Sequence, residues 1–331
     1  MNWSSVISSS QLKKMGILGM NRRNIAYIGR YNPRHLFPLV DDKLRTKKLA
    51  EEHQIPTPKL LGEIRSQSEM KDWLELVEGH QGFVLKPAKG SGGKGILVIS
   101  GRQGEDFVKS SGQVIQASHI ERHQSNILAG LYSLGGAKDV IIAESLLCPN
   151  TIFEHYSYEG IPDIRVIVFR GYPVMAMIRL STHSSDGKAN LHQGAIGVGL
   201  DIATGRAVHA VQKDALVTAH PDTLAPLVDI QIPYWKDILT LAARCYDVTG
   251  LGYLGTDVVL DEHQGPMLLE LNARPGLSIQ IANHAGLLPR LRTIETIKKP
   301  AQNPEERVAF SQTNFQVPQS NIGDETPCVH Q

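Results

Sequence analysis

Apolar and polar positions alternate around Glu270, a pattern typical of a β-strand with one polar face. Successive side chains of an extended chain point to opposite faces, so Glu270 and Asn272 lie on the same face. The apolar run 255–260 predicts a second strand, and residues 261–266 predict the turn that joins the two. In a symmetric hairpin Asp257 lies opposite Glu270, because opposed residues are nearest neighbours across an antiparallel pair.

A second hairpin is predicted on either side of a glycine-rich segment. Residues 83–85 are apolar, and the β-rich run 96–99 follows the last glycine. Glycine lets the backbone bring its N–H groups against an anion, and Lys86 would add positive charge to a phosphate contact. The loop residues that we expect to bind phosphate besides Lys86 are Gly90, Ser91, Gly92, Gly93 and Lys94.

Two other nucleotide motifs compete for this loop. Gly90, Gly92 and Gly95 fit the G-x-G-x-x-G pattern of an NAD-dependent dehydrogenase, but that pattern has to open a helix. The run after Gly95 predicts a strand instead. A Walker loop is excluded because Gly95 follows Lys94, and Ala88 stands where the first glycine belongs.

Helical and extended segments surround the two hairpins. A helix is predicted from Lys43 to about residue 51, before Pro56 enforces extended chain. A capping box of Ser66 and Glu69 predicts a second helix, with apolar residues at the helical interval. Further strands are predicted at 140–143, 165–169 and 174–178, and a helix with an apolar stripe is predicted near Trp235.

The order of these elements divides the chain into four parts. They are an N-terminal leader (1–40), a first lobe with the glycine hairpin (41–143), a second lobe with the carboxylate hairpin (144–297) and a C-terminal tail (298–331). The tail is rich in Pro, Gln and Asn and poor in apolar residues, so we expect it to be disordered.

Composition narrows the class of protein without identifying it. The 331 residues suffice for two or three lobes, and a net charge of +1 gives no bias toward nucleic acid or membrane partners. Cys148, Cys245 and Cys328 are too scattered for a disulfide framework or a C-x-x-C metal site, which fits a reducing compartment. We find no signal-type apolar core and no run approaching the ~18 residues of a membrane span, so we expect a cytoplasmic protein. The oligomeric state stays open.

The carboxylate hairpin carries a set of hard oxygen ligands in Asp257, Glu270 and Asn272. Mg²⁺ takes few protein oxygens and completes its coordination with waters and substrate phosphates. Beside a predicted phosphate loop, this set predicts a magnesium site. The simpler explanation is three solvated residues on an edge hairpin.

Together these motifs resemble the ATP-grasp superfamily, and within it they are similar to the α-L-glutamate ligases, such as the enzyme that adds glutamates to a ribosomal protein. The resemblance covers about residues 41–297. It implies an α+β fold in which two lobes clamp ATP, with the short leader in place of a full pre-grasp domain. The motifs that carry it are Lys86 with its glycine loop, 163–165, 190–194, Asp257 and 270–276.

The resemblance also implies how the nucleoside is bound. Backbone groups of Glu144, Ser145 and Leu146 would bind the adenine edge. Asp163 would accept hydrogen bonds from ribose, with Glu154 as the alternative, because the segment before Asp163 is longer than usual.

Other roles concern phosphate and the reacting atoms. By resemblance Asn190 positions phosphate and metal, Lys43 contacts phosphate, and Arg165, Arg179 and Arg274 neutralise phosphate or a developing oxyanion. The alternatives are surface salt bridges for the arginines and a solvated helix position for Lys43.

Two histidine-containing segments have simpler explanations. His192 could carry a proton, but a loop histidine is more often a hydrogen-bonded structural residue. The segment 119–123 begins and ends with histidine, but its Glu does not follow the first His as in H-E-x-x-H, so we predict a solvated helix face rather than a zinc site.

The function implied is an ATP-dependent carboxylate–amine ligase that forms an amide or peptide bond through an acylphosphate, with glutamate as a family-level guess for the added amino acid. Its cofactors would be ATP and two Mg²⁺ ions, with Mn²⁺ as a substitute. Its partners would be a carboxylate and an amine, the acceptor being an amino acid, a peptide or a protein. The alternatives are an ATP-grasp kinase that stops after phosphorylation and a non-catalytic nucleotide-binding module.

Overall fold

We describe a computed structural model of the chain over residues 8–90 and 92–318. Ser91, expected in the phosphate loop, and Cys328 lie outside the described residues. The chain separates into two compact units: unit 1 comprises Met1–Phe37, Ile152–Val259 and Leu271–Gln331, and unit 2 comprises Pro38–Thr151 and Leu260–Glu270. Within the described residues, we find no helix with both the length and the apolar content of a membrane span.

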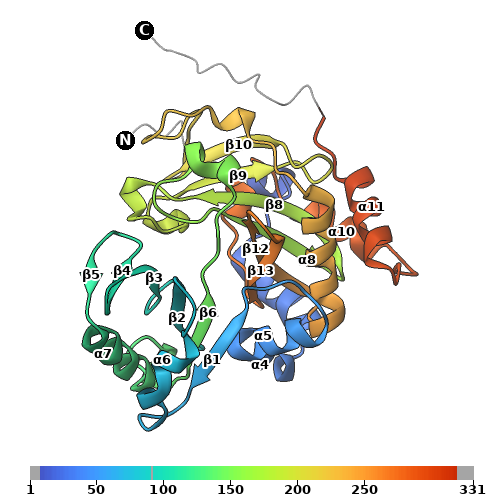
Figure 1. Ribbon diagram of the computed structural model, residues 1–331. Coiled ribbons are helices and arrows are strands. Elements are labelled where there is room, and N and C mark those ends of the chain that lie inside the picture. The colour runs from blue at the N-terminus through green and yellow to red at the C-terminus, as the bar shows by residue number, and fades with distance from the viewer. Residues whose placement is uncertain (1–7, 91, 319–331) are drawn as a thin grey trace. The chain divides into compact units, whose positions relative to one another are not determined.

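Unit 2 contains a six-stranded sheet with the strand order β1-β6-β2-β3-β4-β5 (Figure 1). Every neighbouring pair is antiparallel. The strands are β1 (Leu60–Ile64), β2 (Phe83–Pro87), β3 (Leu97–Gln103), β4 (Asp106–Lys109), β5 (Val114–Ile115) and β6 (Ile141–Ser145). The helices are α4 (Pro38–Asp41), α5 (Lys43–Glu52), α6 (Trp73–Leu76) and α7 (Ala117–Leu128).

The core of unit 2 is built around three aromatic rings. Trp73, Phe83 and Phe107 are fully buried, with ring centroids 5.4 to 6.2 Å apart, and Ile120 and Ile127 of α7 join the same cluster. Burying such side chains is the main source of stability of a lobe of this size. The core therefore fixes β2, which leads into the glycine loop.

The helix predicted from Lys43 is confirmed as α5. Asp42 caps it, since its side chain accepts hydrogen bonds from the backbone N–H groups of Leu44 (3.0 Å) and Arg45 (3.2 Å).

The capping box of Ser66 and Glu69 is not formed as predicted. The Ser66 hydroxyl contacts the Glu69 carboxylate at 3.1 Å, and the helix begins with a 3₁₀ turn (Glu69–Asp72) before the single turn of α6. Ser66 binds the Glu69 side chain, so its hydroxyl does not cap the helix.

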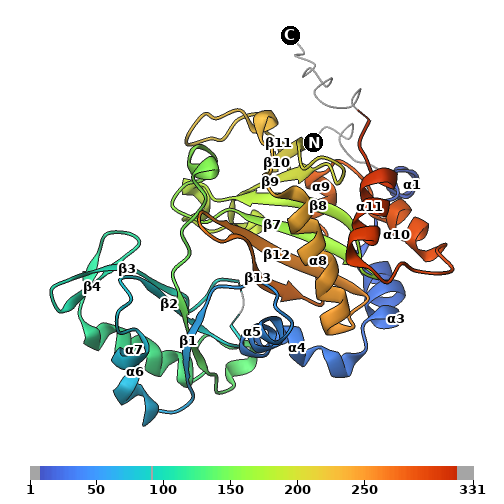
Figure 2. The same ribbon diagram turned by 45° about the vertical axis from the view of Figure 1, so that its right-hand side comes forward.

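Unit 1 is built on the seven-stranded sheet β11-β10-β9-β8-β7-β12-β13 (Figure 2). Its strands are β7 (Asp163–Phe169), β8 (Tyr172–Leu180), β9 (Ile196–Leu200), β10 (Ala207–Gln212), β11 (Ala215–Leu216), β12 (Tyr253–Asp261) and β13 (Gly265–Asn272), the last assigned mostly to unit 2. The predicted 165–169/174–178 hairpin is confirmed as β7 and β8. Helix α8 (Trp235–Thr249) presents its buried side to β7 and β8, as the apolar stripe predicts.

Within the N-terminal segment, residues 8–37 group with unit 1 and include several helices. These residues contain α1 (Ser9–Lys14), α2 (Met20–Arg22), a π-helix (Arg23–Ile28) and α3 (Gly29–Tyr31). Tyr27 and Tyr31 pack edge-on against Phe169, with ring centroids 5.5 and 4.8 Å from it. Tyr27 and Ile28 are therefore part of the core of unit 1, whereas α1, α2 and α3 have no buried residues.

The prediction of a disordered tail from residue 298 is wrong for residues 304–314, which form α11 (Pro304–Asn314). Helices α9 (Ile279–Ala282) and α10 (Leu288–Glu295) precede it. Val308 is fully buried where α11 packs on α8 and β8, and Arg307 pairs with Asp247 at 2.5 Å. The average composition of the tail did not reveal these few buried positions. Residues 319–331 lie outside the described part of the chain.

The boundary between the units also differs from the predicted one at the carboxylate hairpin. Residues 260–270 group with unit 2, because Asp261 accepts the backbone N–H of Cys148 (2.9 Å) and the backbone N–H of Leu268 donates to Pro56 (2.8 Å).

Candidate functional site

Four charged side chains form a buried cluster on three neighbouring strands of unit 1. Strand register places Asp257 of β12 opposite Arg165 of β7, and Asp163 of β7 opposite Arg179 of β8. Asp163 and Arg165 are two residues apart and therefore share a face. We call these four residues the arginine–aspartate cluster.

The cluster is joined by short, charge-assisted hydrogen bonds. Arg165 donates to both oxygens of Asp257 (Nε–Oδ1 2.8 Å, Nη2–Oδ2 2.6 Å). Arg179 donates in the same bidentate way to Asp163 (2.5 and 2.7 Å) and also to Oδ2 of Asp257 (2.7 Å). Such paired contacts fix the planes of both guanidinium groups.

The two aspartates differ in their affinity for protons. Burial raises the pKa of Asp163 from 3.8 to about 6, and repulsion from Asp257 adds to burial while Arg179 opposes it. Burial would also raise the pKa of Asp257, but Arg165 and Arg179 lower it from 3.8 to about 2. Both carboxylates are ionised at pH 7, consistent with their bidentate partners.

The structure thus brings together four residues to which the sequence assigned separate roles. Asp163 was expected to meet ribose, Arg165 and Arg179 phosphate, and Asp257 a metal. The sequence did not predict that they bind one another. The signal was present as charged residues at alternate positions of an otherwise apolar strand, 163–169.

The remaining predicted metal ligands are also partnered. Glu270 forms an ion pair with Lys43 (3.3 Å), and its side chain is 40% exposed. Asn272 accepts the backbone N–H of Arg274 (2.8 Å), whose guanidinium lies over the ring of Phe37, 4.8 Å from the centroid.

The chemical types of the predicted ligands suit a hard cation. A carboxylate offers about four acceptor positions, and three N–H groups occupy those of Asp257, which leaves one. Glu270 and the Asn272 amide oxygen supply the other donors that Mg²⁺ prefers. In residues 8–90 and 92–318 no group of three or more His, Cys, Asp or Glu side chains could hold a metal.

Unit 2 contains a second buried charged group, which we call the lysine–glutamate cluster. Glu144 of β6 pairs with Lys86 of β2 (2.6 Å) and with Lys47 of α5 (2.8 Å). Burial would raise the pKa of Glu144, but Lys86 and Lys47 lower it, whereas burial lowers the pKa of Lys47. Two ammonium groups around one carboxylate leave one surplus positive charge.

Lys47 is a site residue that the sequence analysis missed. Its spacing of four from Lys43 places both lysines on one face of α5, which was the available signal. Lys47 also donates to the Thr57 hydroxyl (2.6 Å) and to the Pro58 carbonyl. The Glu144 side chain faces these lysines, and its backbone lies in β6 opposite Leu60 of β1 and Val84 of β2. The adenine contact stays a prediction.

Next to Glu144, the backbone N–H and the hydroxyl of Ser145 already have hydrogen-bond partners. The Ser145 backbone N–H donates to the Lys59 carbonyl (2.9 Å) and its hydroxyl accepts the Lys59 N–H (3.0 Å). Leu146 is half-buried. Glu154, the alternative ribose ligand, is exposed on a 3₁₀ helix of unit 1.

The glycine loop joins β2 and β3, which pair antiparallel from Phe83 opposite Ile99. Gly92, Gly93 and Gly95 have φ of 62°, 73° and 76°, a backbone region open to glycine. A strand, β3, and not a helix follows Gly95. This contradicts the dinucleotide-binding alternative and confirms the predicted hairpin.

Lys43 connects this loop to the carboxylate strand within unit 2. Its Nζ donates to the Gly90 carbonyl (2.7 Å) and lies 3.3 Å from Glu270. Lys94, at the tip of the loop, is exposed. A loop residue, a lysine and a predicted metal ligand are therefore in contact.

The predicted 190–194 motif is held by local hydrogen bonds. The Asn190 side chain accepts the His192 backbone N–H (3.1 Å) and so caps a 3₁₀ turn. The Gly194 carbonyl accepts from Thr182 (3.0 Å) and Gln212 (2.8 Å). His192 itself is exposed.

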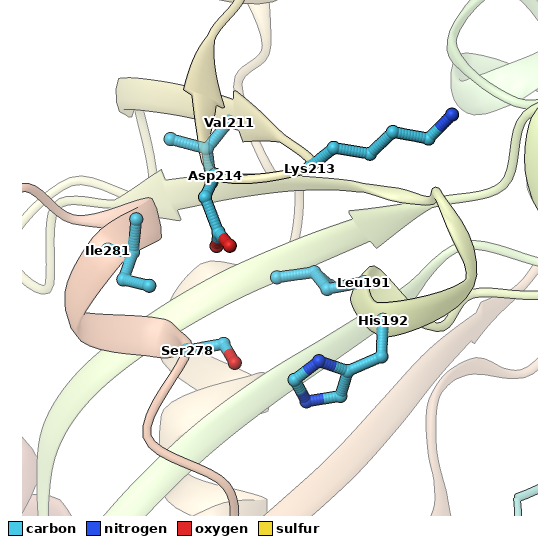
Figure 3. Close-up of a pocket in the computed structure, with 7 residues that line it drawn as sticks. All are labelled: Leu191, His192, Val211, Lys213, Asp214, Ser278 and Ile281. Atoms are coloured by element: carbon cyan, nitrogen blue, oxygen red, sulfur yellow. The ribbon is translucent and has the colours of Figure 1, made fainter. Parts of the chain in front are cut away.

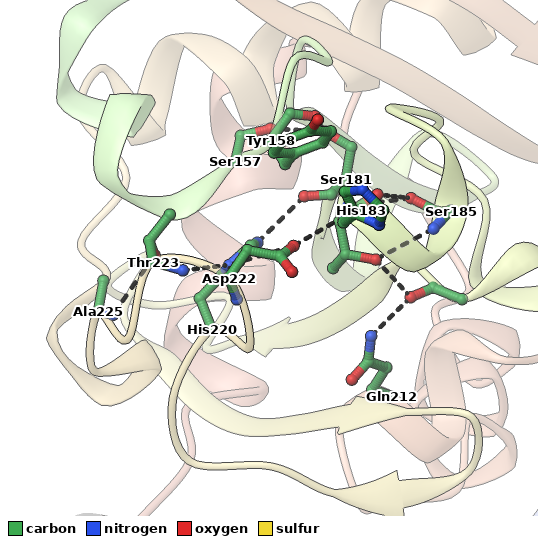
Figure 4. Close-up of polar contacts among 12 residues, drawn as sticks. Ser157, Tyr158, Ser181, His183, Ser185, Gln212, His220, Asp222, Thr223 and Ala225 are labelled. Atoms are coloured by element: carbon green, nitrogen blue, oxygen red, sulfur yellow. Dashed lines mark hydrogen bonds and ion pairs between the residues drawn. The ribbon is translucent and has the colours of Figure 1, made fainter.

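Hydrogen bonds also hold the loops of unit 1 that contain His183 and His220. The His183 backbone N–H donates to Asp222 (2.8 Å), as Figure 4 shows. Buried His220 accepts the Asp222 N–H at Nδ1 (3.2 Å), which leaves Nε2 to donate to the Ser181 carbonyl (3.1 Å). This histidine is a structural residue with a fixed tautomer.

A small pocket of about 240 Å³ lies in unit 1 beside the 190–194 motif. Figure 3 shows the Asp214 carboxylate directed toward the pocket and the Lys213 side chain extending away from it. The sequence analysis did not single out either residue. The pocket is lined by Leu191, His192, Val211, Lys213, Asp214, Ser278 and Ile281.

The segment 119–123 lies on α7, as predicted, but its face is not fully solvated. His119 is exposed, whereas His123 is half-buried, with Nε2 3.0 Å from the Gly95 carbonyl. Burial lowers the pKa of His123, so its imidazole is neutral at pH 7.

The glycine hairpin, the α+β units and the order of the charged motifs define an ATP-grasp protein. The chain belongs to the sugar-transfer associated ATP-grasp family, which matches residues 22–296. The ATP-grasp and α+β predictions are therefore confirmed, whereas the narrower likeness to α-L-glutamate ligases stays a prediction. A search of curated proteins gave no match.

Several solved structures are similar to this chain at low identity. The ATP-grasp ligase PsnB, complexed with a minimal precursor, is 13% identical (TM-score 0.45) and is matched over 80% of this chain and 63% of its own. D-cycloserine synthetase DcsG is 16% identical (TM-score 0.46; 87% and 79%). D-alanine–D-alanine ligase from Bacillus anthracis is 14% identical (TM-score 0.42; 84% and 69%). The chain spans about three fifths of the length of the PsnB chains that it matches.

Proposed function

We propose that this protein is an ATP-dependent carboxylate–amine ligase that forms an amide or peptide bond through an acylphosphate. The observation that carries the proposal is the contact of Lys43 with both Gly90 and Glu270. It joins a glycine loop suited to phosphate with a carboxylate suited to Mg²⁺ inside one unit. Membership of the ATP-grasp family supports ATP as the nucleotide.

The lysine–glutamate cluster supports phosphate binding by its surplus charge. Lys86 lies at the start of the loop, and Glu144 holds its ammonium group in place. We propose that Lys86, Lys43 and the loop backbone contact the phosphates, and that backbone groups of 144–146 contact adenine. Asp163 or Glu154 would then meet ribose.

The metal ligands in this proposal are Asp257, Glu270 and Asn272. Mg²⁺, with two ions expected and Mn²⁺ as a substitute, would neutralise phosphate charge when bound. Asp257 keeps its remaining acceptor position aligned because Arg165 and Arg179 fix its carboxylate.

The reaction has two balanced steps. A substrate carboxylate oxygen attacks the γ-phosphorus of ATP and releases ADP, which gives an acylphosphate. An amine nitrogen then attacks the acyl carbon and releases phosphate. We propose that Arg165, Arg179 or Arg274 stabilises the oxyanion of the second step and that Asn190 positions phosphate.

Glutamate is the first amino acid that we would test, and we propose a cytoplasmic location. The test is ADP and phosphate release with Mg²⁺-ATP across a panel of amino acids and short peptides, with products followed by mass spectrometry. The ligase proposal predicts that ADP release requires both an acid and an amine and yields a condensed product.

A phosphorylated product formed without an amine would instead identify a kinase. ATP binding with no turnover across the panel would favour a non-catalytic module.

A further inference from the structure

A buried carboxylate outside the predicted site holds the start of the glycine loop. Asp139, between α7 and β6, is 4% exposed. Both of its oxygens lie within hydrogen-bonding distance of the Lys89 backbone N–H (3.0 and 3.1 Å). It also accepts from the Ser133 hydroxyl (2.5 Å) and from the backbone N–H of Val140 (2.8 Å).

Further contacts join the same segment of unit 2 to the loop. Gly90 forms an isolated antiparallel bridge with Ser133, the residue that donates to Asp139. Beyond the loop, the Gly95 carbonyl lies 3.0 Å from Nε2 of His123. A Cβ on Gly95 would approach the Tyr132 ring to 2.6 Å, so only glycine fits there.

These contacts make Asp139 a link between the loop and the core. The loop backbone has to keep its N–H groups directed at an anion, and the Lys89 N–H is already used by Asp139. The direction of the next peptide groups is therefore set at Lys89, one residue before Gly90, whose carbonyl accepts from Lys43. Both oxygens of the buried Asp139 carboxylate accept hydrogen bonds, so Asp139 can hold the loop backbone without facing the phosphates.

We infer that Asp139 is a positioning residue for the phosphates of ATP: it orients the glycine loop through the Lys89 backbone and touches no substrate. The inference rests on the proposed function for the identity of the ligand.

The test compares Asp139→Ala and Asp139→Asn with a matched control, Asp261→Ala. Asp261 is an equally buried aspartate of unit 2 that accepts the backbone N–H groups of Cys148, His263 and Gln264. Hydrogen exchange is followed in the ATP-free protein in peptides that end before Ser91. Affinity is measured for Mg²⁺-ATP and, separately, for adenosine.

Asp139→Ala should speed exchange at Lys89 and weaken ATP binding by about 10-fold, because a hydrogen bond to a charged group is lost. Adenosine affinity should stay within about 2-fold of wild type, since the proposed contacts of the loop are to phosphate only. Asp139→Asn keeps one acceptor oxygen and should recover part of both effects. Asp261→Ala should speed exchange at His263 and Gln264 but leave Lys89 unchanged.

Unchanged exchange at Lys89 in Asp139→Ala would overturn the inference. So would equal losses of ATP and adenosine affinity, which indicate a general loss of structure. A wild-type protein that binds no ATP would refute the proposed function and, with it, this role of Asp139, whereas ATP binding without ligation would refute the ligase proposal and leave this inference standing.

Discussion

The two units each bury a charged cluster, but the clusters differ in charge balance. In unit 1, Arg165 and Arg179 face Asp163 and Asp257, so the positive and negative charges are equal in number. In unit 2, Lys47 and Lys86 share only Glu144. A balanced cluster fixes geometry, whereas a cluster with a surplus ammonium group can also accept an anion.

This difference suggests that the two clusters have different roles. Arginine suits the first because its planar fork holds a carboxylate in one orientation, and lysine suits the second because its compact charge can turn toward a phosphate. We therefore propose that the lysine–glutamate cluster binds phosphate and that the arginine–aspartate cluster aligns Asp257, the proposed metal ligand.

The largest expected effect comes from breaking the balance in unit 1. Asp257→Asn removes the charge that two guanidinium groups share, so it should abolish turnover and also lower the free energy of unfolding by about 3 kcal/mol. Glu270→Gln is the matched variant, because that side chain is 40% exposed; it should abolish turnover with little loss of stability. ADP release and urea denaturation measure the two quantities. Full activity in either variant would remove the metal assignment.

Removing the surplus positive charge of the lysine–glutamate cluster should weaken ATP binding. Lys86→Met should weaken Mg²⁺-ATP affinity by about 10- to 100-fold, because a charge-assisted phosphate contact is lost. Lys47→Met is the comparison: Lys47 is committed to Glu144, Thr57 and Pro58, so it should cost more stability and less affinity than Lys86→Met. Titration calorimetry on both variants decides the order. Equal affinities for Lys86→Met and wild type would contradict the assignment.

The raised pKa of Asp163 predicts a pH dependence of stability. The folded protein holds this proton up to about pH 6, whereas the unfolded chain releases it near 3.8. The contribution of Asp163 to stability is therefore complete below pH 3.8 and is lost as pH rises through about 6, on the order of 3 kcal/mol at most. Urea denaturation of wild type and Asp163→Asn between pH 4 and 7 should show the smaller decline in the variant. Parallel curves would show that Asp163 does not titrate in this range.

The smallest effect is expected from a solvated pair on unit 2. Lys48 contacts Glu63 at 2.9 Å, but its side chain is 52% exposed. Lys48→Ala should change the free energy of unfolding by less than about 0.5 kcal/mol and leave ATP affinity unchanged. A large loss of stability or of ATP affinity would show that an exposed ion pair matters as much as the buried clusters, which would contradict the role given to burial.

Local pattern was enough to predict the hairpins and the helices that begin at Lys43 and near Trp235. Those elements are encoded by alternation, helical period and capping residues close in sequence. The ion pairs of unit 1 could not be predicted, because Asp257 meets Arg165 through the pairing of strands that are far apart in the chain. Lys47 and Asp139 were missed because their partners, Glu144 and the Lys89 backbone, also lie far from them in the chain. Helix α11 was missed because a few buried positions hardly alter average composition.

The central claim is that phosphoryl transfer to a carboxylate precedes attack by the amine. The most direct test supplies the substrate acid, found by the panel, with ¹⁸O in its carboxylate and follows the label by mass spectrometry. The account predicts that one ¹⁸O appears in the released phosphate for each amide bond formed, because the acylphosphate oxygen leaves with phosphorus. Amide formation with unlabelled phosphate would contradict it.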